Sequence, residues 1–227
     1  MRIAKYIANA GYCSRRDAEK LILAGKITIN NKQCIHPSEK INNNDKVKIG
    51  KKSIILESKT KLWKIYKPIK YICSNKDQKK RKIIFDLIPP NYPRLISIGR
   101  LDYMTEGLLL FTNNGDFARK LELPKSNYER IYRMCIRGKI DRHHVKKINS
   151  GLEINNIFYK KIHIKIEKFN ETFTWLIIKL REGKNREIRN ICKKFSWKIN
   201  KLIRIQYGPY KLSKLKLGEI KEIKKIY

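Results

Sequence analysis

Residues 99–115, GRLDYMTEGLLLFTNNG, join a polar loop to a short apolar run that closes in a turn signal. Four consecutive apolar residues, 108–111, are typical of a buried strand, and the closing Asn-Asn-Gly favours a turn. We expect Asp116 to cap a short helix over residues 117–121, which Pro124 would end. The stretch therefore predicts a buried strand inside a domain of mixed strands and helices.

The polar part of this stretch holds Arg100 and Asp102 between two glycines, directly before the predicted strand. Short loops on rigid strands often hold catalytic groups. Asp102 can equally serve as a turn residue that bonds nearby backbone N–H groups, and the spacing alone favours this structural role. On the residues alone, both interpretations stay open.

A second polar segment, REGKNREIR at residues 181–189, follows the apolar strand TWLIIKL and opens a helix. The apolar face of that helix would hold Ile188, Ile191, Cys192 and Phe195. Another face would hold Arg186, Arg189 and Lys193. An arginine at a helix start opposes the helix dipole. We infer that it has a carboxylate or phosphate partner, although an exposed basic stripe is the default for an isolated helix.

The charge balance points to a polyanionic partner. The 227 residues include 54 Lys and Arg against 20 Asp and Glu, a formal net charge of +34. Such an excess indicates nucleic acid binding, although an AT-rich genome would also enrich lysine. No apolar run approaches the ~18 residues of a membrane helix, and the N-terminus lacks the apolar core of a secretory signal. We expect a cytoplasmic protein without a membrane partner.

The cysteines do not predict a metal site or a disulfide framework. The chain has five, Cys13, Cys34, Cys73, Cys135 and Cys192, and none forms a C-x-x-C pair. Zinc sites and stapled secreted domains need regular, close spacings. We therefore interpret the cysteines as reduced and mostly buried thiols.

The first residues predict a small module of helices and a short hairpin. Ser14 and Asp17 form a capping-box-like helix start, Gly25 stands where a C-terminal cap is expected, and Asn30-Asn31 favours a turn. The lysine-rich residues 51–61 fit a linker. Basic residues on and after the helix form either a solvated face or a phosphate-binding face; they are Arg15, Arg16, Lys20 and Lys26.

Two further features decide nothing alone. The segment KDQKKRK at residues 76–82 predicts a solvated basic loop or a flexible RNA clamp. Tyr132 lies on a predicted strand, 132–136, where a tyrosine is usually half-buried with its hydroxyl at the edge. Residues 162–166 and 173–180 are also predicted strands.

Taken together, these segments resemble the RsuA/RluB-type ribosomal RNA pseudouridine synthases with an N-terminal S4 RNA-binding domain. The S4-like part is IAKYIANAGYCSRRDAEKLILAGKITINNK. The catalytic signatures are GRLDYMTEGLLLFTNNGDFARKL, REGKNREIRNIC and LIRIQYGPYKL. The resemblance runs from about residue 2 to about residue 218, and it favours the large-subunit, RluB-like branch.

The resemblance implies specific roles. Asp102 matches the family's essential aspartate, Arg189 the basic residue that pairs with it, and Tyr132 the tyrosine that stacks on the base. The uridine must flip out of the RNA to be reached. Arg100 matches a residue that fills the vacated space, and Leu202 an apolar wall of the base pocket. No metal or other cofactor is implied.

Two positions depart from the family pattern. Met104 stands where a polar residue is more common, and this change could alter the loop beside Asp102. Tyr66 precedes Lys67-Pro68 where asparagine is common. Neither change removes a catalytic group.

We therefore predict an α+β protein. Residues 1–60 would form a small helical S4-like RNA-binding module with its linker, and residues 61–227 a catalytic domain on a mixed, largely antiparallel sheet. The expected reaction converts one uridine of ribosomal RNA, most plausibly of the 23S molecule, to pseudouridine. Asp102, Tyr132 and Arg189 would be catalytic. The expected RNA contacts are Arg100, Leu202, Arg186, Arg15, Arg16, Lys20 and Lys26.

Other functions remain open on the sequence. A non-catalytic ribosome-assembly factor of the same fold would bind the same RNA, and a small-subunit (16S) synthase would share the chemistry. A general DNA-coating protein would not need the clustered signatures. The substrate could be free RNA or a pre-ribosomal particle, and a monomer is the default expectation.

Overall fold

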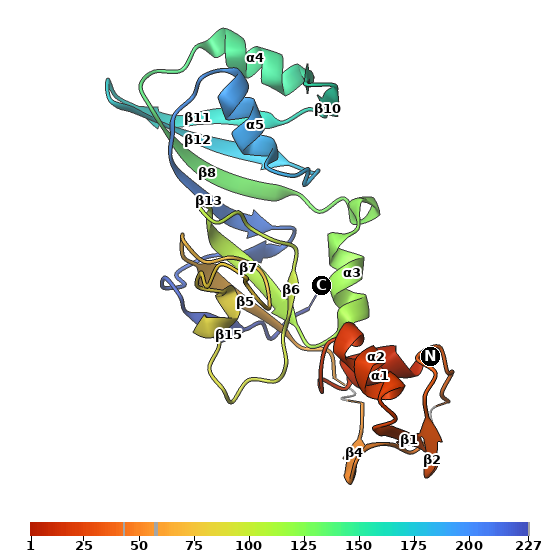
Figure 1. The fold of residues 1–227 in the computed structure, drawn as a ribbon. Coiled ribbons are helices and arrows are strands. Elements are labelled where there is room, and N and C mark those ends of the chain that lie inside the picture. Colours follow the sequence, from red (N-terminus) through yellow and green to blue (C-terminus); the bar gives the residue numbers. More distant parts are fainter. Residues whose placement is uncertain (43, 57–58, 227) are drawn as a thin grey trace.

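The computed structural model describes residues 1–42, 44–56 and 59–226, and it shows two modules (Figure 1). The N-terminal module packs two helices on a small antiparallel sheet of strand order β2-β1-β3-β4. Its elements are α1 (Ile3–Asn9), α2 (Arg15–Leu23), β1 (Ile27–Ile29), β2 (Lys32–Cys34), β3 (Val47–Ile49) and β4 (Lys52–Ile54).

Local sequence signals account for α2. The Ser14 hydroxyl accepts a hydrogen bond from the Asp17 backbone N–H at 3.1 Å and donates one to the Asp17 carboxylate. Gly25 follows the helix with a positive φ of 65°, which suits a residue without Cβ. Ala18 and Ile22 then point into the module core. The predicted cap, helix and hairpin are confirmed.

The prediction for residues 51–61 is wrong in its first part. Lys52–Ile54 forms β4 and pairs with β3, so it belongs to the sheet of the module. The two lysines at 51 and 52 suggested a linker, but Ile54 is buried opposite Val47 of β3. Residues 57 and 58 of the expected linker lie outside the described residues.

The second module is built on a nine-stranded sheet within the described residues. Its central path runs β11-β12-β8-β13-β7-β5-β15, with β6 on β7 and β14 on β13. The strands are β5 (Leu62–Lys67), β6 (Ile96–Ile98), β7 (Glu106–Thr112), β8 (Arg130–Arg137), β11 (His163–Phe169), β12 (Phe173–Leu180), β13 (Ile199–Tyr207), β14 (Tyr210–Lys211) and β15 (Ile220–Glu222). Among the described residues, the strand pairings in this sheet are antiparallel except that of β7 with β13, which is parallel. The α+β class and the largely antiparallel sheet are confirmed.

Helices and a small hairpin surround this sheet. They are α3 (Gly115–Glu122), α4 (Arg142–Ser150), α5 (Glu187–Lys194), the 3-10 turns η1 (Ile84–Leu87) and η2 (Pro124–Ser126), and the hairpin of β9 (Leu152–Ile154) with β10 (Ile157–Tyr159). Figure 1 shows α4 and α5 at the β8–β12 end of the sheet, and α3 next to the N-terminal module. In the part of the chain that the structure describes, every helix is too short or too polar to cross a bilayer.

The cap predicted for α3 is wrong by two residues. Asn114, not Asp116, is the N-cap, and its side chain accepts hydrogen bonds from the N–H groups of Asp116 and Phe117. Asparagine is as good an N-cap as aspartate, so composition alone did not choose between them. Asp116 instead forms an ion pair with Lys5 of α1, 2.7 Å between Nζ and Oδ2.

Strand β7 is buried along its whole length. It lies between β5 and β13, so both of its edges are paired, and its apolar side chains enter a core on each face of the sheet. Gly107 makes this arrangement possible because its φ is +112° and a Cβ there would lie 2.3 Å from the Arg204 carbonyl oxygen on β13. The polar loop before β7 is therefore carried by a rigid strand at the centre of the module.

Candidate active site

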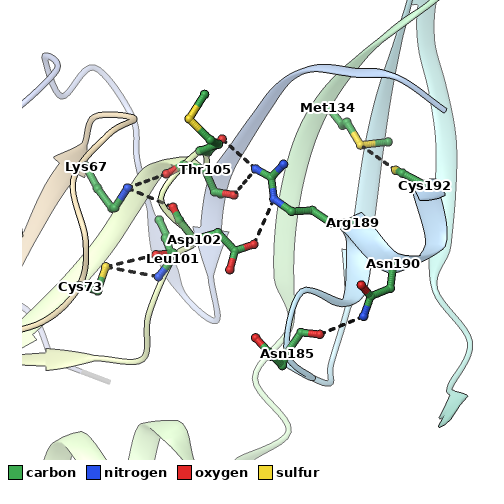
Figure 2. A network of polar contacts seen from close by, with 11 residues as sticks. Lys67, Cys73, Leu101, Asp102, Thr105, Met134, Asn185, Arg189, Asn190 and Cys192 are labelled. Carbon is green, nitrogen blue, oxygen red and sulfur yellow. Dashed lines mark hydrogen bonds and ion pairs between the residues drawn. The ribbon is translucent and has the colours of Figure 1, made fainter. Parts of the chain in front are cut away.

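The loop that leads into β7 is fixed by side chains that bond its backbone (Figure 2). Lys67, at the end of β5, donates from Nζ to the carbonyl oxygens of Asp102 at 3.2 Å and Thr105 at 2.8 Å. Cys73 accepts from the N–H of Leu101 and donates to its carbonyl oxygen. These bonds hold the backbone on both sides of the Asp102 carboxylate.

Arg189 of α5 reaches the same loop from the opposite side of the site (Figure 2). Its Nε lies 3.1 Å from Asp102 Oδ2. Its Nη2 donates to the Met104 carbonyl oxygen and to Thr105 Oγ1, each at 2.8 Å. The planar guanidinium thus binds the carboxylate through Nε and its loop through Nη2, with both donors fixed in one plane.

Packing sets the position of Arg189. Ile188, Ile191 and Cys192 are buried in the core formed by β8, β12 and β13, and the Cys192 thiol lies 3.6 Å from Met134 Sδ. The predicted apolar face of this helix is confirmed, with Phe195 partly buried against the same core. Burial of this face turns Arg189 toward Asp102.

The two charged groups border a cleft of about 820 Å³. Its lining includes six residues predicted from the sequence: Arg100, Asp102, Tyr132, Arg186, Arg189 and Leu202. The Asp102 side chain is 30% exposed and that of Arg189 16%. The ion pair is therefore reachable from the cleft while most of its surface is shielded from water.

The cleft floor is the sheet itself. Tyr132 on β8 and Leu202 on β13 both line it, and Leu202 is 4% exposed. Tyr132 is half-buried and packs against the apolar cores on both sides of the sheet centre. An aromatic ring and an aliphatic side chain at the floor suit the flat face of a nucleobase.

The basic residues occupy different places. Arg186 is exposed at the N-cap of α5 with a left-handed φ of 53°, so it does not share the inward direction of Arg189. The sequence predicted a carboxylate or phosphate partner for an arginine of this helix. That partner is the carboxylate of Asp102, and the arginine that binds it is Arg189. The remaining predicted RNA contacts are exposed on the N-terminal module and do not line the cleft; they are Arg15, Arg16, Lys20 and Lys26.

The basic loop at residues 76–82 lies at the cleft and has internal order. Arg81 forms a two-bond ion pair with Asp77, at 2.8 and 3.0 Å, which holds the pKa of that carboxyl far below its usual range. Lys76, Asp77 and Arg81 all border the cleft. The Arg81 guanidinium also lies 5.9 Å from the ring centre of Tyr103.

Sequence reasoning missed the residues that hold the loop. Lys67 is fully buried, and burial lowers its pKa from 10.5 to about 8. A signal existed, because Lys67 continues the alternation of Trp63 and Ile65 and so faces the interior. Thr105, at 2% exposure, gave no such signal.

A second missed residue, Glu187, lies in the cleft wall. It is 4% exposed, and burial raises its pKa from 4.5 to about 7. One oxygen accepts from the Lys184 backbone N–H at 3.1 Å, and the other has no hydrogen-bond partner among the described residues. Arg130 fastens the same segment to the sheet through the carbonyl oxygen of Arg181, at 2.7 Å.

Met104, which departs from the family pattern, contacts the site through its backbone. The residue is 48% exposed, and its carbonyl oxygen accepts a hydrogen bond from Arg189. Any side chain at this position supplies that oxygen. Among the described residues, no group of three His, Cys, Asp or Glu is placed to hold a metal ion.

Comparison with known proteins identifies the two modules. A model of the RNA pseudouridylate synthase family matches residues 61–194, and a model of the S4 domain matches residues 1–47. The chain is 46% identical over 227 residues to a Rickettsia bellii protein named as an uncharacterized RNA pseudouridine synthase, covering 100% of this chain and 98% of the relative.

Two further matches agree. A Buchnera aphidicola protein from Acyrthosiphon pisum, named ribosomal large subunit pseudouridine synthase B, is 38% identical and covers 98% of this chain and 92% of its own length. A crystal structure of a pseudouridylate synthase shares the fold, with a TM-score of 0.70 at 22% identity, covering 98% of this chain and 96% of that chain. The chain therefore belongs to the RNA pseudouridylate synthase family and carries an S4 domain at its N-terminus.

Proposed function

We propose that this enzyme converts a uridine of large-subunit (23S) ribosomal RNA to pseudouridine, with Asp102 as the essential carboxylate. Pseudouridine synthesis on RNA follows from the family. The choice of the large subunit is supported by the name of the Buchnera relative and by the similarity along nearly the whole chain.

The observation that carries the proposal is the ion pair of Asp102 with Arg189, 3.1 Å apart, on a loop pinned by Lys67 and Cys73. The reaction breaks the C1′–N1 bond and forms a C1′–C5 bond. A carboxylate at the sugar can add to C1′, or it can remove the C2′ proton and give a glycal. Either role requires a carboxylate held at the sugar, and Arg189 supplies both its counter-ion and its orientation.

The other cleft residues would hold the flipped nucleotide. We assign Tyr132 to the base, which it would stack on, and to removal of the C5 proton after the new bond forms. Leu202 would cover the opposite edge of the base. Arg100 would fill the space that the uridine leaves in the RNA, and Arg186, exposed at the cleft, would contact a phosphate.

The N-terminal module would grip the structured RNA through phosphates. Its basic residues Arg15, Arg16, Lys20 and Lys26 are exposed, and exposed Lys and Arg bind RNA backbones without reading sequence. We propose residues 1–60 as this binding module with its linker, and residues 61–227 as the catalytic domain.

The test is release of tritium from ribosomal RNA that lacks pseudouridine and carries the label at uracil C5. We expect release by the wild type and a loss of at least about 1,000-fold in Asp102→Asn, since an amide can neither add to C1′ nor take the C2′ proton. Glu171→Gln, which changes an exposed carboxylate between β11 and β12, is the matched control and should retain release.

Mapping the product decides the subunit. Pseudouridine in 23S RNA would support the full proposal, whereas product confined to 16S RNA would correct the substrate. No release by the wild type, on free RNA and on precursor particles alike, would contradict the proposal and favour a non-catalytic assembly factor.

A further inference from the structure

The cleft floor holds a buried arginine, Arg204, that has no role in the reaction proposed above. Arg204 on β13 is 3% exposed and lines the cleft. Its Nε donates to the Leu108 carbonyl oxygen at 2.8 Å, and its guanidinium carbon lies 5.2 Å from the ring centre of Tyr207. Within the described residues, its Nη2 has no hydrogen-bond partner and no carboxylate forms an ion pair with it.

An unsatisfied guanidinium in the interior is unfavourable, because burial removes its hydration without replacing it. The contact with Tyr207 compensates only in part. Buried polar groups in native proteins nearly always have a partner. An unpaired donor of this kind at the floor of a cleft therefore points to a ligand that supplies an acceptor.

The strand register places Arg204 beside the base-binding residues. In the antiparallel pairing of β13 with β8, Arg204 lies opposite Tyr132, and directly paired residues share a face of the sheet. Leu202, two positions away on β13, lies on that face as well. Arg204, Tyr132 and Leu202 thus form one floor.

Depth distinguishes Arg204 from the other cations of the cleft. Lys184, Arg186 and Arg100 are all exposed, so they lie where a phosphate of the RNA backbone passes. A phosphate stays at the mouth when a nucleotide flips into a pocket. The group that reaches a floor residue of 3% exposure is the nucleobase.

We propose that Arg204 is a substrate-binding residue whose Nη2 donates a hydrogen bond to a carbonyl oxygen, O2 or O4, of the flipped uracil. This inference rests on the proposed function. When the C1′–N1 bond breaks, the bonding electrons stay on the ring, and its negative charge spreads onto both oxygens. A guanidinium donor would therefore bind the detached uracil more strongly than the intact uridine, which accelerates the chemical step.

A paired change of protein and substrate tests this contact. The target uridine is replaced by 2-thiouridine or by 4-thiouridine, since sulfur is a weak acceptor. Single-turnover formation of the isomerised nucleoside is then measured by chromatography after complete digestion of the RNA. The enzymes compared are the wild type, Arg204→Met and Arg204→Lys, with Arg137→Met as an exposed-arginine control on the same sheet.

We expect the wild type and Arg137→Met to slow about 10- to 100-fold on one of the two thio substrates, the range for a charged hydrogen bond. Arg204→Met should slow similarly on ordinary uridine and lose its sensitivity to that thio substrate. The thio substrate whose effect disappears in Arg204→Met identifies the oxygen that Arg204 contacts, O2 for 2-thiouridine and O4 for 4-thiouridine. Arg204→Lys lacks Nη2 but keeps the charge, so it gives the same answer if the methionine variant does not fold.

Two results overturn the inference. One is a wild type that is active on uridine and insensitive to both thio substrates, and the other is a set of Arg204 variants that keep the full wild-type sensitivity. In either case the proposed function stands. A wild type that forms no pseudouridine in unmodified RNA instead contradicts the proposed function itself, and this contact falls with it.

Discussion

At the scale of single residues, Glu187 is a buried carboxyl group whose ionisation destabilises the fold. Its carboxyl is 4% exposed and only one of its oxygens has a hydrogen-bond partner among the described residues. Burial disfavours the ionised form and raises its pKa from 4.5 to about 7. In this interval the folded state binds a proton that the unfolded state has lost.

Stability should therefore decrease as the pH rises from about 4.5 to about 7, and stay lowered above that range. Glu187→Gln keeps an acceptor for the Lys184 N–H and removes the titration. We compare the free energy of unfolding of this variant with that of the wild type at each pH. The difference, variant minus wild type, should be larger at pH 8 than at pH 5 by about 2 kcal/mol. Urea denaturation of the RNA-free proteins at both pH values measures this difference.

The matched control is Glu153→Gln, which removes an exposed carboxylate on β9. Its stability relative to the wild type should not change between the two pH values by more than a few tenths of a kcal/mol. An equal response of both variants would mean that burial of Glu187 does not control this pH dependence.

The sequence predicted the site residues that line the cleft, but it missed those that hold the loop in place. Spacing alone favoured a turn role for Asp102, and only the combined signatures turned it into a candidate catalyst. Lys67 bonds carbonyl oxygens 35 and 38 residues further along the chain. A motif names the residues that touch a substrate, whereas such long-range bonds exist only once β5 and β7 are paired.

At the scale of elements, Gly107 governs the junction of β7 with β13. A Cβ there would lie 2.3 Å from the carbonyl oxygen and 2.6 Å from the nitrogen of Arg204, and the φ of +112° already disfavours any other residue. Backbone atoms cannot rotate away as a side chain can. We expect Gly107→Ala to lower the free energy of unfolding by about 3 kcal/mol or more, measured by urea denaturation.

Gly218 provides the comparison that separates backbone strain from crowding. It also has a positive φ, +78°, but a Cβ there meets nothing within 4 Å. Gly218→Ala should cost about 1–2 kcal/mol, the penalty of the left-handed conformation alone. Equal losses for the two alanine variants would show that the close approach of β13 has no energetic weight.

Elements with strong local signals were predicted well. The α2 cap and the limits of β12 follow from residues next to them in sequence. Strand β4 was missed because Lys52 and Ser53 are exposed and only Ile54 is buried, so its pairing with β3 decides its structure. The cap of α3 was misplaced because Asn114 and Asp116 are equally good by propensity, and the chain geometry selects the first.

At the scale of the whole molecule, the net charge is +34. Its cations fall into two groups, those bound inside the protein and those exposed on its surface. Arg189 and Lys67 are bound internally, whereas the basic residues of α2 are exposed on a module joined to α3 by the Lys5–Asp116 ion pair. The composition predicted a polyanion partner but could not say which cations meet it. Salt dependence can separate the two groups.

Neutralising the basic residues on and directly after α2 should weaken the salt dependence of RNA binding. Each phosphate contact contributes about −0.7 to −0.9 to the slope of log K against log salt, through counterion release. Replacing Arg15, Arg16, Lys20 and Lys26 together by Gln should therefore make the slope less negative by about 3. Binding of the ribosomal RNA substrate, titrated at several salt concentrations, measures the slope.

A second set of exposed lysines near the C-terminus gives the same change in net charge; it is Lys211, Lys214, Lys216 and Lys224, each replaced by Gln. If contacts rather than total charge set the slope, this set should shift it by less than about 1. Equal shifts would mean that the RNA senses only the overall field of the protein. The assignment of the N-terminal module as the phosphate grip would then be wrong, because its cations would act no differently from lysines elsewhere on the surface.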